Sequence, residues 1–113
     1  MQPVNNFITD LIDGMENNQA NTLIITGDSY PYYLIADKMK KLTTFGAIET
    51  AELVEDMEAL GIFIKDDQNL SYSHISDNGE GRKWILRLYT TLSDRQIPSV
   101  VIRIVPGSVG GQP

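Results

Sequence analysis

The second half of the chain alternates between runs of β-branched and aromatic residues and short clusters of turn-forming residues. The runs are "IFI" at 62–64, "LSYSHI" at 70–75, "KWILRLYTTL" at 83–92 and "SVVIRIV" at 99–105. Runs of this composition, separated by a few residues such as Asp, Asn, Gly and Ser, are typical of successive antiparallel strands. They restrict the chain to folds that contain an antiparallel sheet.

Two other segments have the periodicity of helices. Apolar residues at positions 4, 7, 8, 11, 12 and 15 recur at helical steps and predict a first helix with one buried face. In residues 47–60, a second stripe predicts another helix, with Gly46 as a possible cap and Gly61 at the stop position. That stripe consists of Ile48, Ala51, Val54, Met57 and Leu60.

Between the helices, "TLIIT" at 22–26 and "YYLIA" at 32–36 predict a hairpin, with Pro31 placed at the start of its second strand. "DKMKKL" at 37–42 is compatible with a short third strand that has its lysines on the solvent side. The order of elements predicts an α+β domain, with a mostly antiparallel sheet of five or six strands and both helices on one face. We expect residues 1–106 to form this one domain and "GSVGGQP" at 107–113 to be a flexible linker or tail.

Composition narrows the class of protein. The chain has 113 residues, enough for one core, and its net charge of −6 disfavours nucleic acid and anionic lipid as partners. It has no cysteine, no signal-peptide pattern and no apolar run near the ~18 residues that a membrane helix needs. A cytoplasmic protein without membrane insertion is therefore expected.

The usual motifs of self-contained enzymes are absent from the sequence. There is no G-x-x-x-x-G-K-[ST] loop and no G-x-S-x-G elbow, and the single His74 cannot form a multi-histidine metal site. Asp66 and Asp67 form an acidic pair in a predicted turn, where solvent-facing acids are common. We therefore expect no catalytic residue, metal or cofactor in this chain alone.

Three arginines are the most informative polar residues. Arg87, Arg95 and Arg103 follow one another at steps of eight, and the first and last lie within apolar predicted strands. A guanidinium in such a strand must reach an acid of the same domain, the solvent, or an anion supplied by a partner. The sequence leaves open whether these arginines are paired internally or bind an external anion.

The second predicted helix carries carboxylates without a Lys or Arg among them. Glu49, Glu52, Glu55 and Asp56 are candidates for an interaction face, and an ordinary solvated face is the alternative.

Four stretches resemble the amino-terminal, PAS-like domain of the PilT-like motor ATPases of type IV pilus retraction and secretion. "NTLIITGDSYPYYLIADKMKKL" is similar to the opening hairpin of that domain, and "TAELVEDMEALGI" is similar to its intervening helix. "NLSYSHI" resembles the next strand, and "RLYTTLSDR" with "IRIVP" resembles its arginine-rich closing pair. The chain departs from the family pattern at Asn69, Tyr89, "TLI" in the first strand and Pro98.

The resemblance implies that this domain precedes a RecA-like ATPase core in a hexameric motor that binds ATP and Mg²⁺. It implies that Arg87, Arg95 and Arg103 reach nucleotide phosphate held by the core of the same or an adjacent subunit. It also implies a cytoplasmic location, or a peripheral one at the inner membrane through a secretion machine.

Two alternatives come from other classes of protein. One is a free-standing acidic secretion chaperone, which would also be small, α+β and free of cysteine. The other is a PAS-type sensor or interaction module that holds a small ligand near Trp84, Tyr72 and Phe63.

Overall fold

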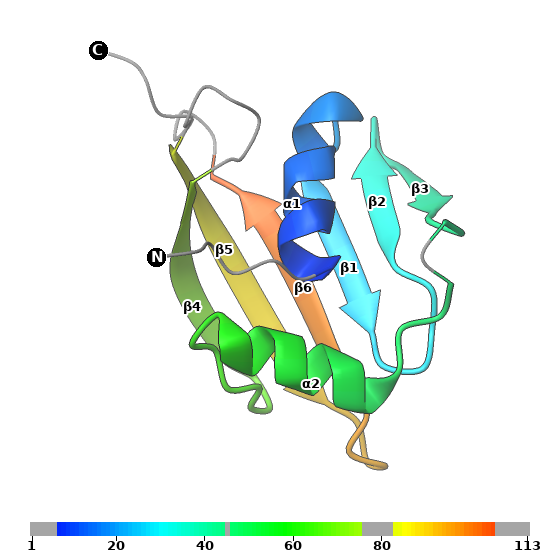
Figure 1. Cartoon of the computed structure of the whole chain (residues 1–113), viewed down its shortest axis with the longest axis vertical. Coiled ribbons are helices and arrows are strands. Elements are labelled where there is room, and N and C mark those ends of the chain that lie inside the picture. The colour runs from blue at the N-terminus through cyan, green and yellow to red at the C-terminus, as the bar shows by residue number, and fades with distance from the viewer. Residues whose placement is uncertain (1–6, 45, 76–82, 106–113) are drawn as a thin grey trace.

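The computed structural model describes residues 7–44, 46–75 and 83–105; expectations for Val4 and for the tail at 107–113 lie outside this range. The predicted α+β class is confirmed (Figure 1). The elements, in chain order, are α1 (Phe7–Asn17), β1 (Thr22–Thr26), β2 (Tyr32–Ile35), β3 (Lys38–Lys41), α2 (Thr50–Ala59), β4 (Gln68–Ile75), β5 (Lys83–Leu92) and β6 (Pro98–Ile104).

The six strands form one sheet in the order β3-β2-β1-β6-β5-β4, and every neighbouring pair is antiparallel. β1 and β6 lie side by side at the centre, so the strands that precede α2 join those that follow it. This pairing of distant segments positions the arginine-bearing strands β5 and β6 well inside the sheet.

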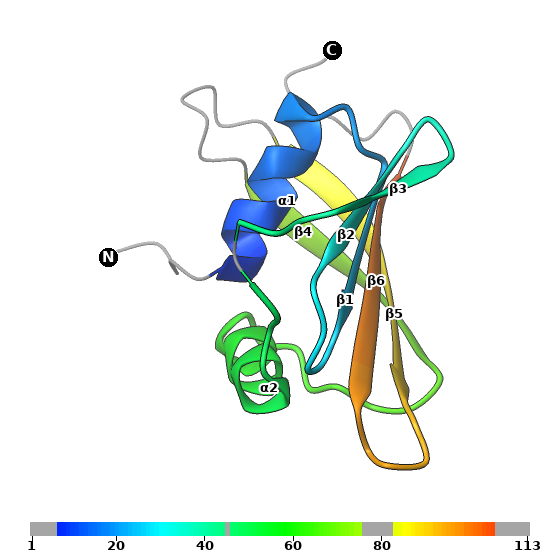
Figure 2. The same ribbon diagram turned by 90° about the vertical axis from the view of Figure 1, so that its right-hand side faces the viewer.

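Both helices cover the same face of the sheet (Figure 2), as the sequence predicts. The inward side chains of the central strands are fully buried under them, among them Leu23, Leu86 and Ile102. Side chains alternate along a strand, so the neighbours of these residues point to the opposite face. No described helix covers that second face, which we call the open face.

The first helix forms as predicted. Its stripe of Ile8, Leu11, Ile12 and Met15 is buried against the sheet. The chain leaves the helix through Gln19, whose φ of 57° is left-handed.

The prediction for the second helix is right in kind but wrong at its start and in its buried stripe. α2 begins at Thr50, whose amide donates to the Asp28 carboxylate, and it buries Leu53 and Met57. Ala51 is exposed. Ile48 is buried outside the helix because its backbone exchanges hydrogen bonds with Asp28 and Ser29 in an isolated bridge. Gly61, with φ of 84°, does follow the end of the helix.

The predicted strand at 62–64 is wrong. "IFI" is an irregular connection in which Ile62 is buried and Phe63 is 61% exposed. The Ile62 amide donates to the Met57 carbonyl, so this backbone completes the end of α2 instead of entering a ladder. Alternating burial without a pairing partner does not make a strand.

The predicted lysine-bearing strand is confirmed as β3, which pairs with β2 across Ala36 and Asp37. Both turn residues have positive φ, 50° and 65°, as a two-residue hairpin of type I′ requires. All four residues of β3 are exposed at one margin of the sheet.

Candidate functional site

The even spacing of the three arginines follows from the symmetry of one hairpin. Arg87 of β5 lies directly opposite Arg103 of β6. Leu92 pairs with Pro98, so the turn spans residues 93–97 and Arg95 is its middle residue. Partners in this hairpin therefore lie at equal distances in sequence from Arg95, and two steps of eight place the outer arginines side by side.

Arg87 and Arg103 lie on the open face and are exposed. Their neighbours Leu86, Leu88 and Ile102 are buried under the helices on the other face. The hairpin thus separates its two kinds of side chain: the apolar ones stabilise the core, and the guanidinium groups point away from it.

Among the described residues, no ion pair neutralises these arginines. The hydrogen-bonded contact between His74 and Asp13 lies on the helical face, away from both arginines. The strand residues that share the open face with the arginines, such as Thr22, Tyr89 and Val101, include no carboxylate among the described side chains. Like charges directly opposite in a sheet repel each other, so the pairing of Arg87 with Arg103 does not stabilise the fold.

A shallow hollow of about 390 Å³ lies at this pair. Besides the arginines it is lined by Asn69, Leu88, Tyr89 and Val101. Two guanidinium groups present several N–H donors in fixed forks, the geometry that suits phosphate or carboxylate oxygens. The chemistry of the hollow therefore suits an anion.

Tyr89, which lines this hollow, is bonded to Asp67. The Tyr89 hydroxyl donates to Asp67 Oδ1 at 2.8 Å, and this hydrogen bond raises the pKa of Tyr89. Asp66 accepts from the Leu92 amide. The acidic pair predicted in a turn is in that turn and is exposed, and both carboxylates also accept hydrogen bonds from β5.

Arg95 is not part of this hollow. It is exposed in the turn, where its amide donates to the Ser93 hydroxyl. From Arg87 the strand runs five further residues to Leu92, about 17 Å at ~3.3 Å per residue. The structure thus brings two of the three predicted arginines together and leaves the third at the end of the hairpin.

The candidate acidic face divides in a similar way. Glu49, Glu52 and Glu55 are exposed, whereas Asp56 is half-buried. Burial raises the pKa of Asp56, a hydrogen bond with the Phe7 backbone opposes that rise, and the Glu55 charge adds to it. Asp56 therefore joins α2 to the start of α1.

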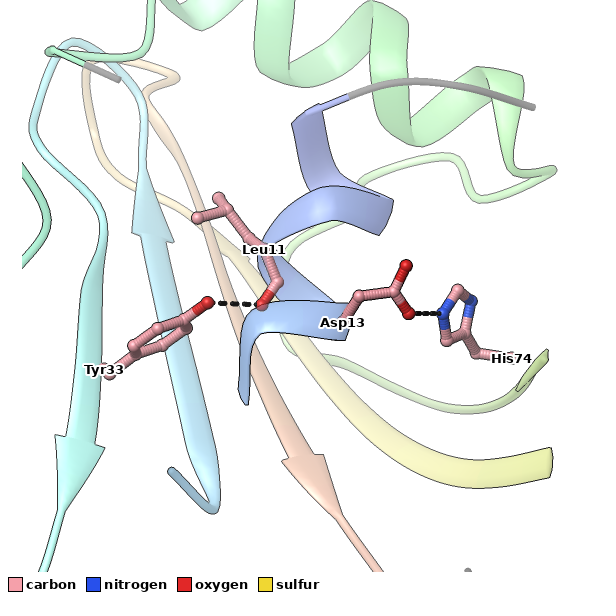
Figure 3. Close-up of polar contacts among 4 residues, drawn as sticks. All are labelled: Leu11, Asp13, Tyr33 and His74. Atoms are coloured by element: carbon pink, nitrogen blue, oxygen red, sulfur yellow. Dashed lines mark hydrogen bonds and ion pairs between the residues drawn. The ribbon is translucent and has the colours of Figure 1, made fainter. Parts of the chain in front are cut away.

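Sequence reasoning missed two polar contacts that fix α1 across the sheet (Figure 3). On one side, the Tyr33 hydroxyl of β2 donates to the Leu11 carbonyl at 2.6 Å. On the other, His74 Nε2 of β4 lies 2.8 Å from Asp13 Oδ1. Alternation along β4 places His74 on the same face as Leu70 and Tyr72, but nothing in the sequence identified Asp13 as its partner.

A second hollow, of about 330 Å³, lies between α1 and the β2–β3 hairpin, with Tyr33, Lys40 and Thr43 among its lining residues. Neither hollow is lined by Trp84, Tyr72 or Phe63, the residues considered for a sensor pocket. Trp84 is buried, whereas Phe63 is exposed.

In the described parts of the chain, no group of three His, Cys, Asp or Glu side chains could hold a metal ion. No helix there is long and apolar enough to cross a membrane.

No protein-family model matches this sequence, and no curated protein matches it. Solved structures do. The fold recurs inside ATPases, one of them a pilus retraction motor. The similar structures are the Legionella pneumophila ATPase DotB (TM-score 0.64, 12% identity), the Yersinia pseudotuberculosis ATPase DotB (0.64, 12%) and the pilus retraction motor PilT with bound ADP (0.60, 15%).

The match covers 94% of this chain for each DotB and 88% for PilT, but only 29–32% of those longer chains. The chain spans less than a third of the length of the ATPases it resembles. At 12–15% identity the comparison establishes a shared fold. It agrees with the family resemblance that the sequence motifs suggest.

Proposed function

We propose that this chain is the amino-terminal, PAS-like domain of a hexameric pilus or secretion motor ATPase. In this role it packs against a RecA-like core and presents Arg87 and Arg103 to an anion held by that core, either a nucleotide phosphate or a carboxylate at a subunit interface. Arg95, at the end of the hairpin, reaches a separate contact.

The observation that carries this proposal is an exposed pair of arginines with no described counter-ion, on a fold that recurs inside motor ATPases. Two cations directly opposite each other lower the stability of the fold. A contact with the ATPase core accounts for their presence in spite of this cost. The bound ADP of PilT supports nucleotide as the anion.

The chemistry assigned to this chain is limited to charge stabilisation. ATP and Mg²⁺ would be bound by the core, and the guanidinium groups would neutralise developing charge on a transferred phosphoryl group. Their planar forks favour two-point contact with phosphate oxygens, which a lysine cannot reproduce. The domain works in the cytoplasm, or at the inner membrane as part of a secretion machine.

The first test is the sequence of the parent gene, which is expected to encode a G-x-x-x-x-G-K-[ST] motif downstream of this domain. The second is ATP turnover by the full-length protein. Arg87→Gln and Arg103→Gln are each expected to lower kcat by 10²-fold or more, roughly the effect of losing one preorganised charge donor.

Lys38→Gln provides the matched control, because it removes another exposed cation, on β3, four strands from Arg87. Its turnover is expected to stay within about twofold of wild type. A parent gene without the nucleotide-binding motif, or full activity in both arginine variants, would refute the proposal.

A further inference from the structure

The two margins of the sheet differ in a way that the proposed function does not explain. β3 is a four-residue edge strand with Lys38, Lys40 and Lys41, which blocks pairing with another strand through charge. β4 is an eight-residue edge strand, "QNLSYSHI", with no Asp, Glu, Lys, Arg, Pro or Gly. It lies along the margin opposite β3 (Figure 1). One edge is protected and the other is not.

The hydrogen-bond pattern shows which backbone groups of β4 face outward. The Val105 amide donates to the Ile85 carbonyl, so the odd-numbered residues of β5 bond to β6. The even-numbered residues of β5 therefore bond to β4, where Leu88 is opposite Leu70 and Leu86 is opposite Tyr72. The N–H and C=O groups of Asn69, Ser71 and Ser73 are left pointing away from the sheet. Among the described residues no backbone or side-chain group bonds to them.

We propose that this free edge pairs with β4 of a second copy of the chain, antiparallel about a twofold axis that places Ser71 opposite itself. In this register Asn69 lies opposite Ser73, and their outward backbone groups face one another as hydrogen-bonded pairs. On the helical side, Leu70 lies opposite Tyr72, an aromatic–aliphatic pair of the kind that favours strand association. The two sheets become one of twelve strands.

Three observations select a second copy as the occupant. Of the two described edges, only β4 offers eight residues, so a second β4 matches it in length whereas β3 covers half of it. Because β4 has no Asp, Glu, Lys or Arg, self-pairing brings no such like charges together, in contrast to a pair of β3 strands. A twofold contact also uses up both unprotected edges, so association through β4 stops at two copies. This inference does not rest on the proposed function, since the open face stays accessible.

The test is sedimentation equilibrium of the complete 113-residue chain over a range of concentrations. Wild type is expected to reach twice its mass of 12.6 kDa. Ser71→Pro deletes the outward N–H of each copy without removing a ladder bond to β5, because edge positions of this kind tolerate proline. Two hydrogen bonds are lost per dimer, so the dissociation constant should rise by about 10- to 100-fold. Ser71→Val keeps the N–H and is expected to remain dimeric.

Hydrogen exchange distinguishes edge pairing from misfolding of the proline variant. In dilute wild type the amides of Asn69, Ser71 and Ser73 should exchange quickly, while those of Leu70, Tyr72 and His74 stay protected. At dimer-forming concentrations both sets should be protected in wild type, and only the second set in Ser71→Pro. A monomer at all concentrations, or a dimer unaffected by Ser71→Pro, would overturn the proposal. So would an edge that pairs only with an added extended peptide.

Discussion

Removing one member of the arginine pair is expected to stabilise the fold while it impairs the proposed function. Arg87 lies directly opposite Arg103 on the open face, and no described carboxylate pairs with either. Arg87→Gln keeps most of the aliphatic stem and a polar end, but it abolishes the repulsion. An arginine that folding requires would show the reverse effect.

The size of the effect follows from Coulomb's law in water. Two unit charges about 6 Å apart repel by about 0.7 kcal/mol without salt, and screening at physiological ionic strength reduces this to about 0.3 kcal/mol. In 0.01 M salt the penalty is about 0.6 kcal/mol, and in 1 M salt it is about 0.1 kcal/mol. Arg87→Gln should therefore gain stability mainly at low salt.

The assay is urea unfolding at low and high salt, with Arg95→Gln as the matched control. Both variants change the net charge of the acidic chain by the same amount, but only Arg87 faces another arginine across a ladder. We expect Arg87→Gln to be more stable than Arg95→Gln by about 0.5 kcal/mol in 0.01 M salt, and equal to it in 1 M salt. If Arg87→Gln were less stable by 3–5 kcal/mol, Arg87 would have a buried internal partner and the reasoning would be refuted.

Three further predictions concern the core and the contacts of α1. Leu53→Ala should lower the free energy of unfolding in urea by about 2–5 kcal/mol, because Leu53 is fully buried. Its control is Ala51→Ser on the exposed side of α2, which should change the same free energy by less than about 0.5 kcal/mol. Tyr33→Phe should cost about 1 kcal/mol at neutral pH through the lost bond to the Leu11 carbonyl. Burial raises the pKa of Tyr33 to about 12. The contribution of its neutral form to the free energy of unfolding is therefore complete below pH 10 and is lost as the pH rises towards 12. Wild type should therefore lose stability over this window relative to Tyr33→Phe, and parallel pH profiles would contradict the assignment. A double-mutant cycle of Asp13→Ala and His74→Ala should give a coupling of about 0.5–3 kcal/mol, and additive effects would show that their 2.8 Å contact contributes nothing.

Local pattern was enough to predict most of the fold. The stripe of α1, the hairpin of β1 and β2, and the long closing strands each carry their period in a few adjacent residues. The sequence did not reveal that "IFI" lacks a pairing partner, because a ladder depends on which strands lie side by side. Ile48 misled the prediction of α2 for the same reason, since its burial comes from a bridge to Ser29, a residue distant in sequence.

The candidate site was predictable in part. Alternation along each strand assigned Arg87 to one face of its strand and Arg103 to one face of its own. Only the register of β5 with β6 places the two arginines opposite one another on the same face of the sheet. The same register excludes Arg95 from the hollow, although all three arginines look equivalent in the sequence. The contact of His74 with Asp13 joins β4 to α1 across more than half of the chain, and no local pattern encodes such a pair.

The central claim is that the arginine pair faces an anion supplied by another part of a motor. A crystal structure of the full-length parent protein with bound nucleotide tests it most directly. We expect the guanidinium groups of Arg87 and Arg103 to lie about 2.7–2.9 Å from phosphate or carboxylate oxygens of an ATPase core. Both groups lying in open solvent, with the core against another face of the domain, would contradict the account.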